Sequence, residues 1–275
     1  MARSKEGRTF WAGGLLEVQG LSVTLGRDRV LDAVDLAVEP RTWTAVIGPN
    51  GSGASTLLRA LAGVGRHDGR VLLDGRNVDQ LDPRSRAAEI GFAPQAPILP
   101  ESLAVREYVM LGRMPYRGLI GGPTEGDRDV VTGVLDRLDL LGVADRPLRA
   151  LSGGHRQRVV LARAVAQGPR VLLLDEPVSA LDVGHGQRVL ELVDELRRDE
   201  GITVVTALHD LTLAGQYADR LVLLAGGRVA AAGPPAEVLT SDVVAEHYGA
   251  SVQVITGPDG VRVVPVRPAR TTAQA

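Results

Sequence analysis

Residues 42–63 constrain the fold more than any other stretch, because three local patterns follow one another there without interruption. TWTAVIG (42–48) is a short apolar run of residues that favour strands, and STLLRALAG (55–63) has the apolar spacing of a helix that ends at a glycine. Between them, GPNGSGASTL (48–57) contains a glycine-rich turn. A strand, a glycine-rich turn and a helix in this order favour a phosphate-binding loop.

Apolar runs and helical patterns alternate along the rest of the chain. Strand-like runs stand at 15–26, 29–40, 69–75, 89–94, 171–177 and 202–210. Helical patterns stand at 102–113, 128–143, 153–168 and 186–201. Two further segments, 220–233 around Gly226 and Gly227 and 252–266, predict hairpins. Because the runs at 171–177 and 202–210 begin with apolar stretches that show no alternation of polar and apolar residues, we expect an α/β fold with a parallel sheet covered on both faces.

Net charge, cysteine content and apolar run length limit the compartment and the partners. The 275 residues carry a net charge of -2, so no basic field points to nucleic acid or to an anionic membrane surface. The absence of cysteine excludes disulfides and thiolate metal sites and is compatible with a reducing cytosol. No apolar run approaches the roughly 18–20 residues of a membrane span, and the start lacks a signal-peptide core. We expect a cytoplasmic chain without nucleic-acid partners.

The glycine-rich turn has the residues that a phosphate loop needs, with one exception. Glycines allow backbone N–H groups to turn inward around an anion, and the following helix adds the positive end of its dipole. Ser55 stands where a hydroxyl would reach Mg²⁺, but Ala54 stands where the pattern G-x-x-x-x-G-K-[ST] has lysine. From this segment alone, a plain glycine-rich turn remains an alternative. The candidate residues, called the phosphate loop below, are Gly48, Pro49, Asn50, Gly51, Ser52, Gly53, Ala54, Ser55 and Thr56.

A second candidate element is VLLLDEP (171–177), an apolar run that ends in two acids. Asp175 is placed to hold Mg²⁺, and Glu176 is placed to polarise an attacking water as a general base. Two solvated acids at the end of a strand are the plain alternative. The phosphate loop upstream favours the nucleotide interpretation over that alternative.

The third element is LSGGHRQRVVLARAVAQ (151–167), called the signature segment below. Ser152, Gly153 and Gly154 precede a helical pattern and so form a second anion-binding helix start. With this segment, the sequence strongly resembles the ATP-binding cassette ATPases, the nucleotide-binding subunits of ABC transporters, over about residues 15–250. The resemblance implies a P-loop NTPase (RecA-like) core, about 15–95 and 169–250, with an antiparallel β subdomain. It also implies a helical subdomain, about 96–168, and a short extension, 251–275.

Three further positions match the family in order and spacing. Gln95, in GFAPQ, matches the glutamine that links the nucleotide site to the helical subdomain. His209, in TALHD, matches the switch histidine that contacts the γ-phosphate, although a histidine at a strand end is by itself more often satisfied locally. Asp182, in SALD, matches the D-loop at the dimer interface. The resemblance therefore implies ATP and Mg²⁺ as ligands, catalytic roles for Glu176, His209 and Gln95, and a metal site formed by Ser55, Gln95 and Asp175.

Members of this family work as head-to-tail dimers in which each ATP lies between two subunits. The resemblance thus implies that Ser152, Gly153, Gly154 and Asp182 act across a homodimer interface. Residues 108–131 and 209–240 resemble importers for iron-siderophores, haem and cobalamin, although a permissive surface loop is the alternative for 114–123. This branch implies transmembrane permease subunits, contacted near residues 95–123, and a substrate-binding protein. The chain would then lie on the inner face of the cell membrane.

Departures from the family pattern bear mainly on hydrolysis. Ala54 removes the charge that the family lysine brings to the β- and γ-phosphates, and Arg59, five residues on, is expected to face away. Trp43 and Tyr217 are expected in the core or an interface rather than as an adenine platform. The smaller departures are His155 for the usual Glu or Gln, Val178 for Thr, and Leu25 near the position of the adenine-stacking aromatic.

We therefore expect the ATPase subunit of an ABC importer for an iron-siderophore, haem or cobalamin-type substrate, with hydrolysis weakened at Ala54. A nucleotide-binding regulatory subunit that hardly turns ATP over is the first alternative; Ala54 favours it, and Glu176 and His209 oppose it. An exporter ATPase is the second. A soluble ABC protein acting on ribosomes or DNA would need two fused cassettes or long coiled coils, which the sequence lacks.

Overall fold

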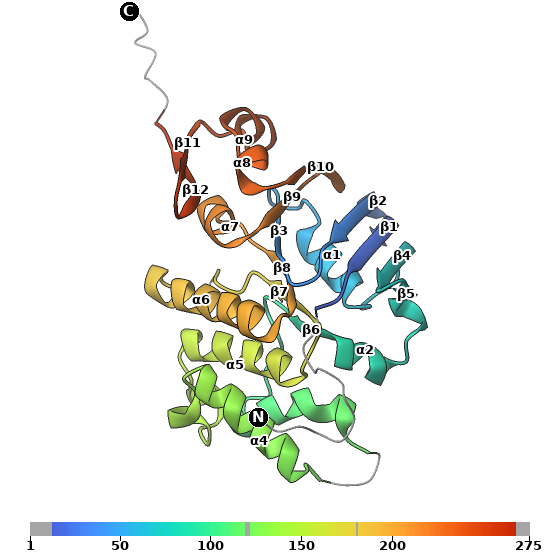
Figure 1. Ribbon diagram of the computed structural model, residues 1–275, viewed down its shortest axis with the longest axis vertical. Coiled ribbons are helices and arrows are strands. Elements are labelled where there is room, and N and C mark those ends of the chain that lie inside the picture. The colour runs from blue at the N-terminus through green and yellow to red at the C-terminus, as the bar shows by residue number, and fades with distance from the viewer. Residues whose placement is uncertain (1–12, 119–121, 180, 268–275) are drawn as a thin grey trace, which may run out of the picture.

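A computed structural model describes residues 13–118, 122–179 and 181–267 of the chain (Figure 1). Its first sheet is antiparallel, in the order β2–β1–β4–β5. The bounds are β1 (Leu16–Leu25), β2 (Asp28–Val38), β4 (Asp68–Leu73) and β5 (Arg76–Asn77). A short 3₁₀ turn, η1 (Val78–Gln80), leads to α2 (Pro83–Glu89), where the Asp82 carboxylate accepts from two backbone N–H groups of the first turn.

The central sheet has the order β10–β9–β3–β8–β7–β6. Its parallel strands are β3 (Trp43–Ile47), β6 (Ile90–Ala93), β7 (Val171–Asp175), β8 (Thr203–Ala207) and β9 (Arg220–Ala225). β10 (Arg228–Gly233) pairs with β9 as an antiparallel hairpin through Gly226 and Gly227, both of positive φ. All residues of β3, β7 and β8 are buried. The predicted parallel sheet, covered on both faces, is confirmed.

α1 (Ala54–Leu61) fills the space between the two sheets. Its buried side chains, Leu57, Leu58 and Leu61, belong to a core cluster that also contains residues of β1, β2, β4, β3, β7 and β8. Burying one leucine stabilises a fold by about 1.5–3 kcal/mol, so these three side chains hold the helix firmly between the sheets. This packing fixes the position at which the phosphate loop enters its helix.

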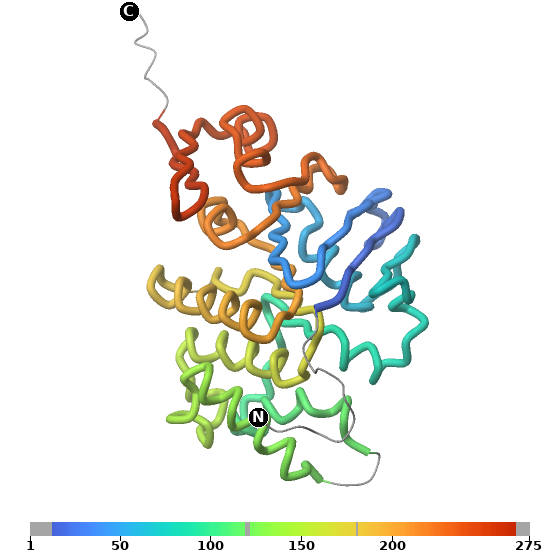
Figure 2. The backbone as a smooth tube through the Cα atoms, viewed as in Figure 1, coloured from blue at the N-terminus to red at the C-terminus, as the bar shows by residue number. Residues whose placement is uncertain are grey.

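Helices cover the other face of the central sheet, where a second core cluster lies. The chain trace in Figure 2 shows these helices stacked below the sheet. Between β6 and β7 the described residues form helices and no strand, as the sequence predicted. The bounds of these segments are α3 (Val105–Met110), η2 (Leu111–Tyr116), α4 (Glu125–Arg137), η3 (Leu141–Val143), η4 (Leu148–Ala150) and α5 (Gly153–Ala166). α6 (Val183–Glu200) follows β7, and α7 (Leu211–Tyr217) follows β8.

A buried ion pair joins three of these helical segments. Arg113 in η2 donates through Nε to Asp127 Oδ1 in α4 at 3.0 Å and through Nη1 to the carbonyl of Ala166, at the end of α5, at 2.8 Å. The two side chains are 10% and 6% exposed. Asp127 also completes a capping box with Thr124 at the start of α4. The relative positions of η2, α4 and α5 therefore depend on this pair.

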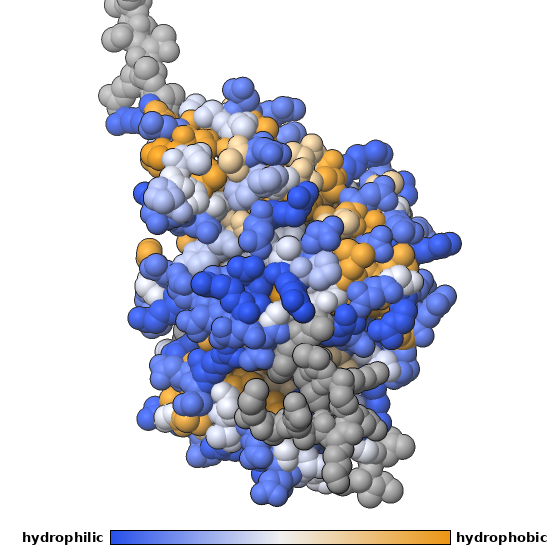
Figure 3. Space-filling model, viewed as in Figure 1, coloured by the Kyte–Doolittle hydropathy of each residue, from blue (hydrophilic) through white to orange (hydrophobic). Residues whose placement is uncertain are grey.

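The C-terminal elements pack against α7. They are α8 (Pro235–Val238), α9 (Ser241–Tyr248) and the hairpin β11 (Val252–Gly257) and β12 (Gly260–Pro265), which confirms the hairpin predicted at 252–266. Thr212 Oγ1 in α7 donates to the carbonyl of Val263 and accepts from its N–H. Most of the face in Figure 3 is hydrophilic, with apolar patches near this hairpin. Within the described part of the chain, no helix combines the length and apolar character needed to cross a bilayer.

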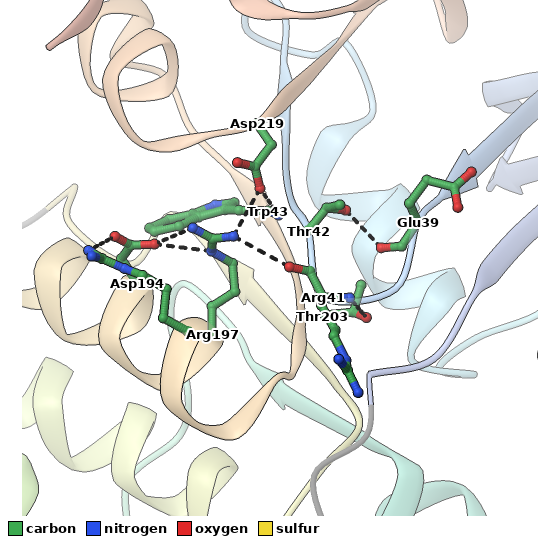
Figure 4. Close-up of polar contacts among 9 residues, drawn as sticks. Glu39, Arg41, Thr42, Trp43, Asp194, Arg197, Thr203 and Asp219 are labelled. Carbon is green, nitrogen blue, oxygen red and sulfur yellow. Dashed lines mark hydrogen bonds and ion pairs between the residues drawn. The ribbon is translucent and has the colours of Figure 1, made fainter. Parts of the chain in front are cut away.

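A polar network fixes the edge of the central sheet at which β3 and β8 begin (Figure 4). Asp219 Oδ2 accepts from the backbone N–H of Trp43 at 2.7 Å and lies 3.3 Å from Arg197 Nη1 in α6. Arg197 Nη2 lies 2.7 Å from Asp194 Oδ1. Trp43 itself is fully buried and donates through Nε1 to Thr206, which confirms its expected place in the core. The network connects α6 to the starts of β3 and β9.

Candidate nucleotide site

The predicted site residues follow the carboxyl ends of four neighbouring parallel strands. The phosphate loop follows β3, His209 follows β8, Glu176 follows β7, and Gln95 follows β6. These strands are adjacent in the sheet in the order β3–β8–β7–β6. Because the carboxyl ends of parallel strands meet at one edge, residues far apart in the sequence come together there. This edge is where open α/β sheets bind their ligands.

The phosphate loop wraps the start of α1 with backbone conformations that glycine favours. Gly51 and Gly53 have φ of 81° and 99°. A Cβ on Gly53 would lie 2.7 Å from Leu31 Cδ2, so a larger residue would also collide with the antiparallel sheet. The N-cap of α1 is Gly53, which has no side chain that could accept a hydrogen bond from the first turn, whereas Asp82, Thr124, Ser152, Asp182, Asp210 and Thr240 cap later helices. The first N–H groups of α1 are therefore open to an anion.

A cavity of about 230 Å³ lies against this helix start. All nine residues of the phosphate loop line it, together with Glu176 and His209 and the apolar residues Val30, Val46, Ala207 and Leu208. Among these described lining residues there is no lysine or arginine. The only lysine of the sequence is Lys5, which lies outside the described residues. No cationic side chain of the described loop thus takes the place of the lysine that Ala54 replaces.

Ser55 and Asp175 meet beside the cavity. Ser55 Oγ donates to Asp175 Oδ1 at 2.8 Å, which joins the start of α1 to the end of β7. Asp175 is 1% exposed, and burial raises the pKa of its carboxyl above the usual value. The hydrogen bond from Ser55 opposes this shift, and the charge of Glu176 adds to it. A hydroxyl and a buried carboxylate in contact are oxygen donors of the kind that Mg²⁺ takes.

Two side chains hold the Glu176 carboxylate. Gln95 Nε2 donates to Oε2 at 2.5 Å, and His209 Nε2 lies 2.6 Å from Oε1. Glu176 also has a positive φ of 48°, an uncommon conformation for a residue other than glycine, which turns the chain sharply after β7. Its backbone N–H donates to the carbonyl of Ala207 at the end of β8. The structure thus brings Gln95, Glu176 and His209 together, with Glu176 and His209 lining the cavity and Gln95 in contact with Glu176.

The structure does not bring the signature segment to this cavity. Ser152 is the N-cap of α5, and Gly153 and Gly154 form its first turn, so the two glycines lie within the helix rather than before it as predicted. None of the three lines the cavity at the phosphate loop. Asp182 caps α6 and lines a separate cleft of about 1140 Å³, which also borders Glu176 and His209. Within one chain, the two candidate anion sites are therefore distinct.

Two kinds of site feature were not predicted from the sequence. Val30 and Ala207 line the cavity, but the side chain of an apolar strand residue carries no chemical signal. For Ala207, the signal is its place two residues before His209; for Val30 there is none. The backbone turn at Glu176 had no signal either, because glutamate does not favour positive φ.

Comparisons with known proteins agree with this geometry. The family model described as ABC transporter matches residues 31–179. The hemin import ATP-binding protein HmuV of Myxococcus xanthus is 43% identical and is matched over 88% of this chain and 93% of its own. The cobalamin import ATP-binding protein BtuD of Halobacterium salinarum is 43% identical over 94% of this chain and 65% of its own. The ferric enterobactin transport ATP-binding protein FepC of Escherichia coli is 36% identical over 88% and 90%.

A solved structure gives the same result for the fold. A chain of a metal-chelate type ABC transporter, in an inward-facing conformation, superposes with a TM-score of 0.80 at 28% identity. The superposition covers 93% of this chain and 99% of the other.

Proposed function

This chain belongs to the ABC transporter family, and we propose that it is the ATP-binding subunit of an importer for an iron-siderophore, haem or cobalamin-type substrate. The observation that carries the proposal is that Ser55 and Glu176 line the cavity of the phosphate loop, where Ser55 donates a hydrogen bond to the buried carboxylate of Asp175. The names of the relatives support the substrate class, because they are import proteins for hemin, cobalamin and ferric siderophores.

In this proposal the phosphate loop binds the phosphates of ATP through the open N–H groups of α1. Ser55, Asp175 and Gln95 would hold Mg²⁺, which supplies positive charge to the phosphates when it is bound. The described residues contain no cluster of three or more histidine, cysteine or acidic side chains that could cage a metal. This agrees with a Mg²⁺ held by few protein ligands together with substrate phosphates.

Glu176 would act as the general base toward the attacking water, and Gln95 and His209 would orient its carboxylate. The two contacts, 2.5 and 2.6 Å, occupy one carboxylate oxygen each and leave further lone pairs for a water. His209 would also contact the γ-phosphate, since it lines the same cavity.

A second copy of the chain would complete the site. Ser152, Gly153, Gly154 and Asp182 would reach the nucleotide of a partner subunit, which is consistent with their absence from the lining of the cavity in their own chain. The Gly153 site offers a sharp test, because a Cβ there meets no atom within 4 Å, so the single chain accepts a side chain without strain. G153D would place a carboxylate against the partner's phosphates. In an E176Q background, we expect ATP to convert the chain from monomer to dimer in sedimentation, and G153D to abolish that dimer while the thermal midpoint stays unchanged. An ATP-induced dimer that survives G153D contradicts this arrangement.

A groove of about 450 Å³ supports contact with a permease near residues 95–123. It lies between α2, η2 and α5, and the exposed side chains Val64, Leu111 and Met114 give it an apolar wall. Its charged lining residues are Arg84, Arg86 and Arg163, without any acid. We propose this groove as the surface for the permease, which would hold the chain on the inner face of the cell membrane. A substrate-binding protein would complete the importer.

We also propose that the chain divides into a core, 15–95 and 169–250, a helical subdomain, 96–168, and an extension, 251–275.

A regulatory subunit that binds ATP with little turnover is the second candidate, and the observation in its favour is the cavity without a lysine at position 54. Equilibrium ATP binding combined with a turnover assay separates the two. If the chain turns ATP over and E176Q abolishes that turnover, the ATPase is supported. If the chain binds ATP and its turnover is no higher than that of E176Q, the regulatory subunit is supported. An exporter ATPase is distinguished by transport assays with the permease that binds this chain, which measure whether the substrate moves into or out of the cell.

A further inference from the structure

The signature segment contains a hydrogen-bonded pair that none of the roles above uses. Ser152 Oγ accepts from the backbone N–H of His155 at 3.4 Å, as an N-cap does. The imidazole of His155 also turns back over the same hydroxyl, with Nδ1 2.9 Å from Ser152 Oγ. A titratable ring nitrogen therefore contacts the side chain that would reach the partner's nucleotide.

The protons available to this pair limit what the serine can do. A hydroxyl donates one proton and accepts through two lone pairs. When Nδ1 carries no proton it can only accept, so the serine proton is directed to His155. When Nδ1 carries a proton, His155 donates to Ser152 Oγ, and the serine proton is free for another acceptor. In the neutral ring Nδ1 carries the proton in one tautomer and not in the other, whereas in the imidazolium Nδ1 always carries it. Protonation of the ring therefore removes the state in which the serine proton is directed to His155.

We propose that His155 is a positioning residue whose protonation frees the Ser152 hydroxyl to donate to the nucleotide phosphate bound by a second copy of the chain. The proposal rests on the dimer of the proposed function. A protonated His155 has a second effect, because it brings a positive charge next to a phosphate site whose described lining has no lysine or arginine. Both effects favour binding of the phosphate by the protonated form.

The groups around His155 come from three elements. Arg158 lies on the same helix, Asp139 and Arg146 lie between α4 and α5, and His185 lies on α6, packed over the first turn of α5. Burial lowers the pKa of the His155 imidazole below its usual value, and Arg158, Arg146 and His185 lower it further, against the opposing effect of Asp139. Asp139 Oδ2 itself accepts from Arg158 at 3.0 Å. Before nucleotide binds, these surroundings therefore favour the neutral form of His155.

A phosphate next to Ser152 reverses this balance. A nearby negative charge favours the imidazolium form, so closure of the dimer around ATP would draw a proton from solvent onto His155. Two results follow at pH values above the pKa that His155 has in the free subunit. Nucleotide binding takes up protons, and both dimerisation and turnover weaken as the pH rises.

The first experiment measures proton uptake without hydrolysis. ATP is titrated calorimetrically into the full-length A54K/E176Q protein at pH 7.5, in two buffers that differ in ionisation enthalpy, and the same is done with the added substitution H155Q. Glutamine is the matched control, because its amide can donate to Ser152 at every pH. We expect a net uptake that H155Q removes. Equal uptake in the two proteins overturns the proposal.

The second experiment measures turnover from pH 6 to 8.5 in the A54K background. Loss of one hydrogen bond to a charged group weakens an interaction by about tenfold or more. The turnover of A54K divided by the turnover of A54K/H155Q should therefore fall about tenfold from pH 6 to pH 8.5. With S152A added, H155Q should change the profile less than it does when Ser152 is present, because only the effect of the His155 charge remains; a merely structural role of His155 does not predict this coupling. Parallel profiles with and without H155Q overturn the proposal alone. If A54K neither binds ATP nor dimerises at any pH, the proposed function fails as well.

Discussion

The substitution Ala54→Lys tests the proposed ATPase most directly. Ala54 begins α1 and lines the cavity at the phosphate loop, where the described residues offer backbone N–H groups but no lysine or arginine. A lysine there would add one ammonium group beside the phosphates, while Ser55, Asp175 and Glu176 keep their contacts. The change restores a single charge and leaves the rest of the site as it is.

The expected magnitude follows from the chemistry of that charge. A hydrogen bond between charged partners contributes about 1.5–3 kcal/mol, so the Kd for ATP should fall by about ten- to a hundredfold. Hydrolysis should gain more, because charge on the transferring phosphoryl group must be stabilised in the transition state. One preorganised donor in a comparable site changes kcat by about 10²–10³. We therefore expect both constants to improve, with the larger gain in kcat.

The assay compares phosphate release from Mg-ATP by the native chain, A54K and A54M at saturating ATP. Methionine is the control, because it has similar length without charge, so A54M should stay near the native rate. Adding E176Q to A54K should abolish the activity, which excludes a contaminating ATPase. Equal rates for the native chain and A54K refute the reasoning about Ala54.

Two further predictions concern stability. Burial raises the pKa of Asp175, so the folded state loses stability as the pH rises from the usual carboxyl pKa of 3.8 through the raised pKa. D175N should therefore raise the thermal midpoint more at pH 7 than at pH 4, and it should abolish Mg-ATP turnover. An equal effect on the thermal midpoint at both pH values contradicts this. Removing one partner of a buried ion pair is destabilising by about 3–5 kcal/mol, so D127A should lower the unfolding free energy in urea by about that amount, and R113M/D127L should recover much of it. A D127A loss below about 1 kcal/mol would mean that Arg113 finds another partner.

The parts of the fold that could be predicted are those in which local pattern and final environment agree. VLLLD begins with four apolar residues, TVVTA consists of threonine, valine and alanine, and the two runs form the buried strands β7 and β8. The helix after the phosphate loop, the α6 helix that ends at Gly201, and both hairpins also follow from periodicity and turn residues. Here propensity, spacing and burial point to the same structure.

The parts that could not be predicted depend on contacts between distant segments. α2 carries no buried residue and thus no apolar period, so its only signal was the Asp-Pro start. The pairing of Arg113 with Asp127 depends on how η2 and α4 are placed, which spacing does not give. The site was predictable as a set of residue types, and its assembly at one sheet edge followed from the parallel topology. The contact of His155 with Ser152 required coordinates, and the functional roles of these residues stay predictions.

The network around Arg197 in Figure 4 lies at only one end of the central sheet. At this end, where β3 and β8 begin, Arg197 contacts Asp194, Asp219 and the carbonyl of Arg41 and so connects α6 to the strands. At the opposite end, β3, β7 and β8 lead into Gly48, Glu176 and Leu208, which line the cavity at the phosphate loop. One end of the sheet is therefore held by charged contacts within the chain, and we expect any displacement caused by a bound ligand to be larger at the other end.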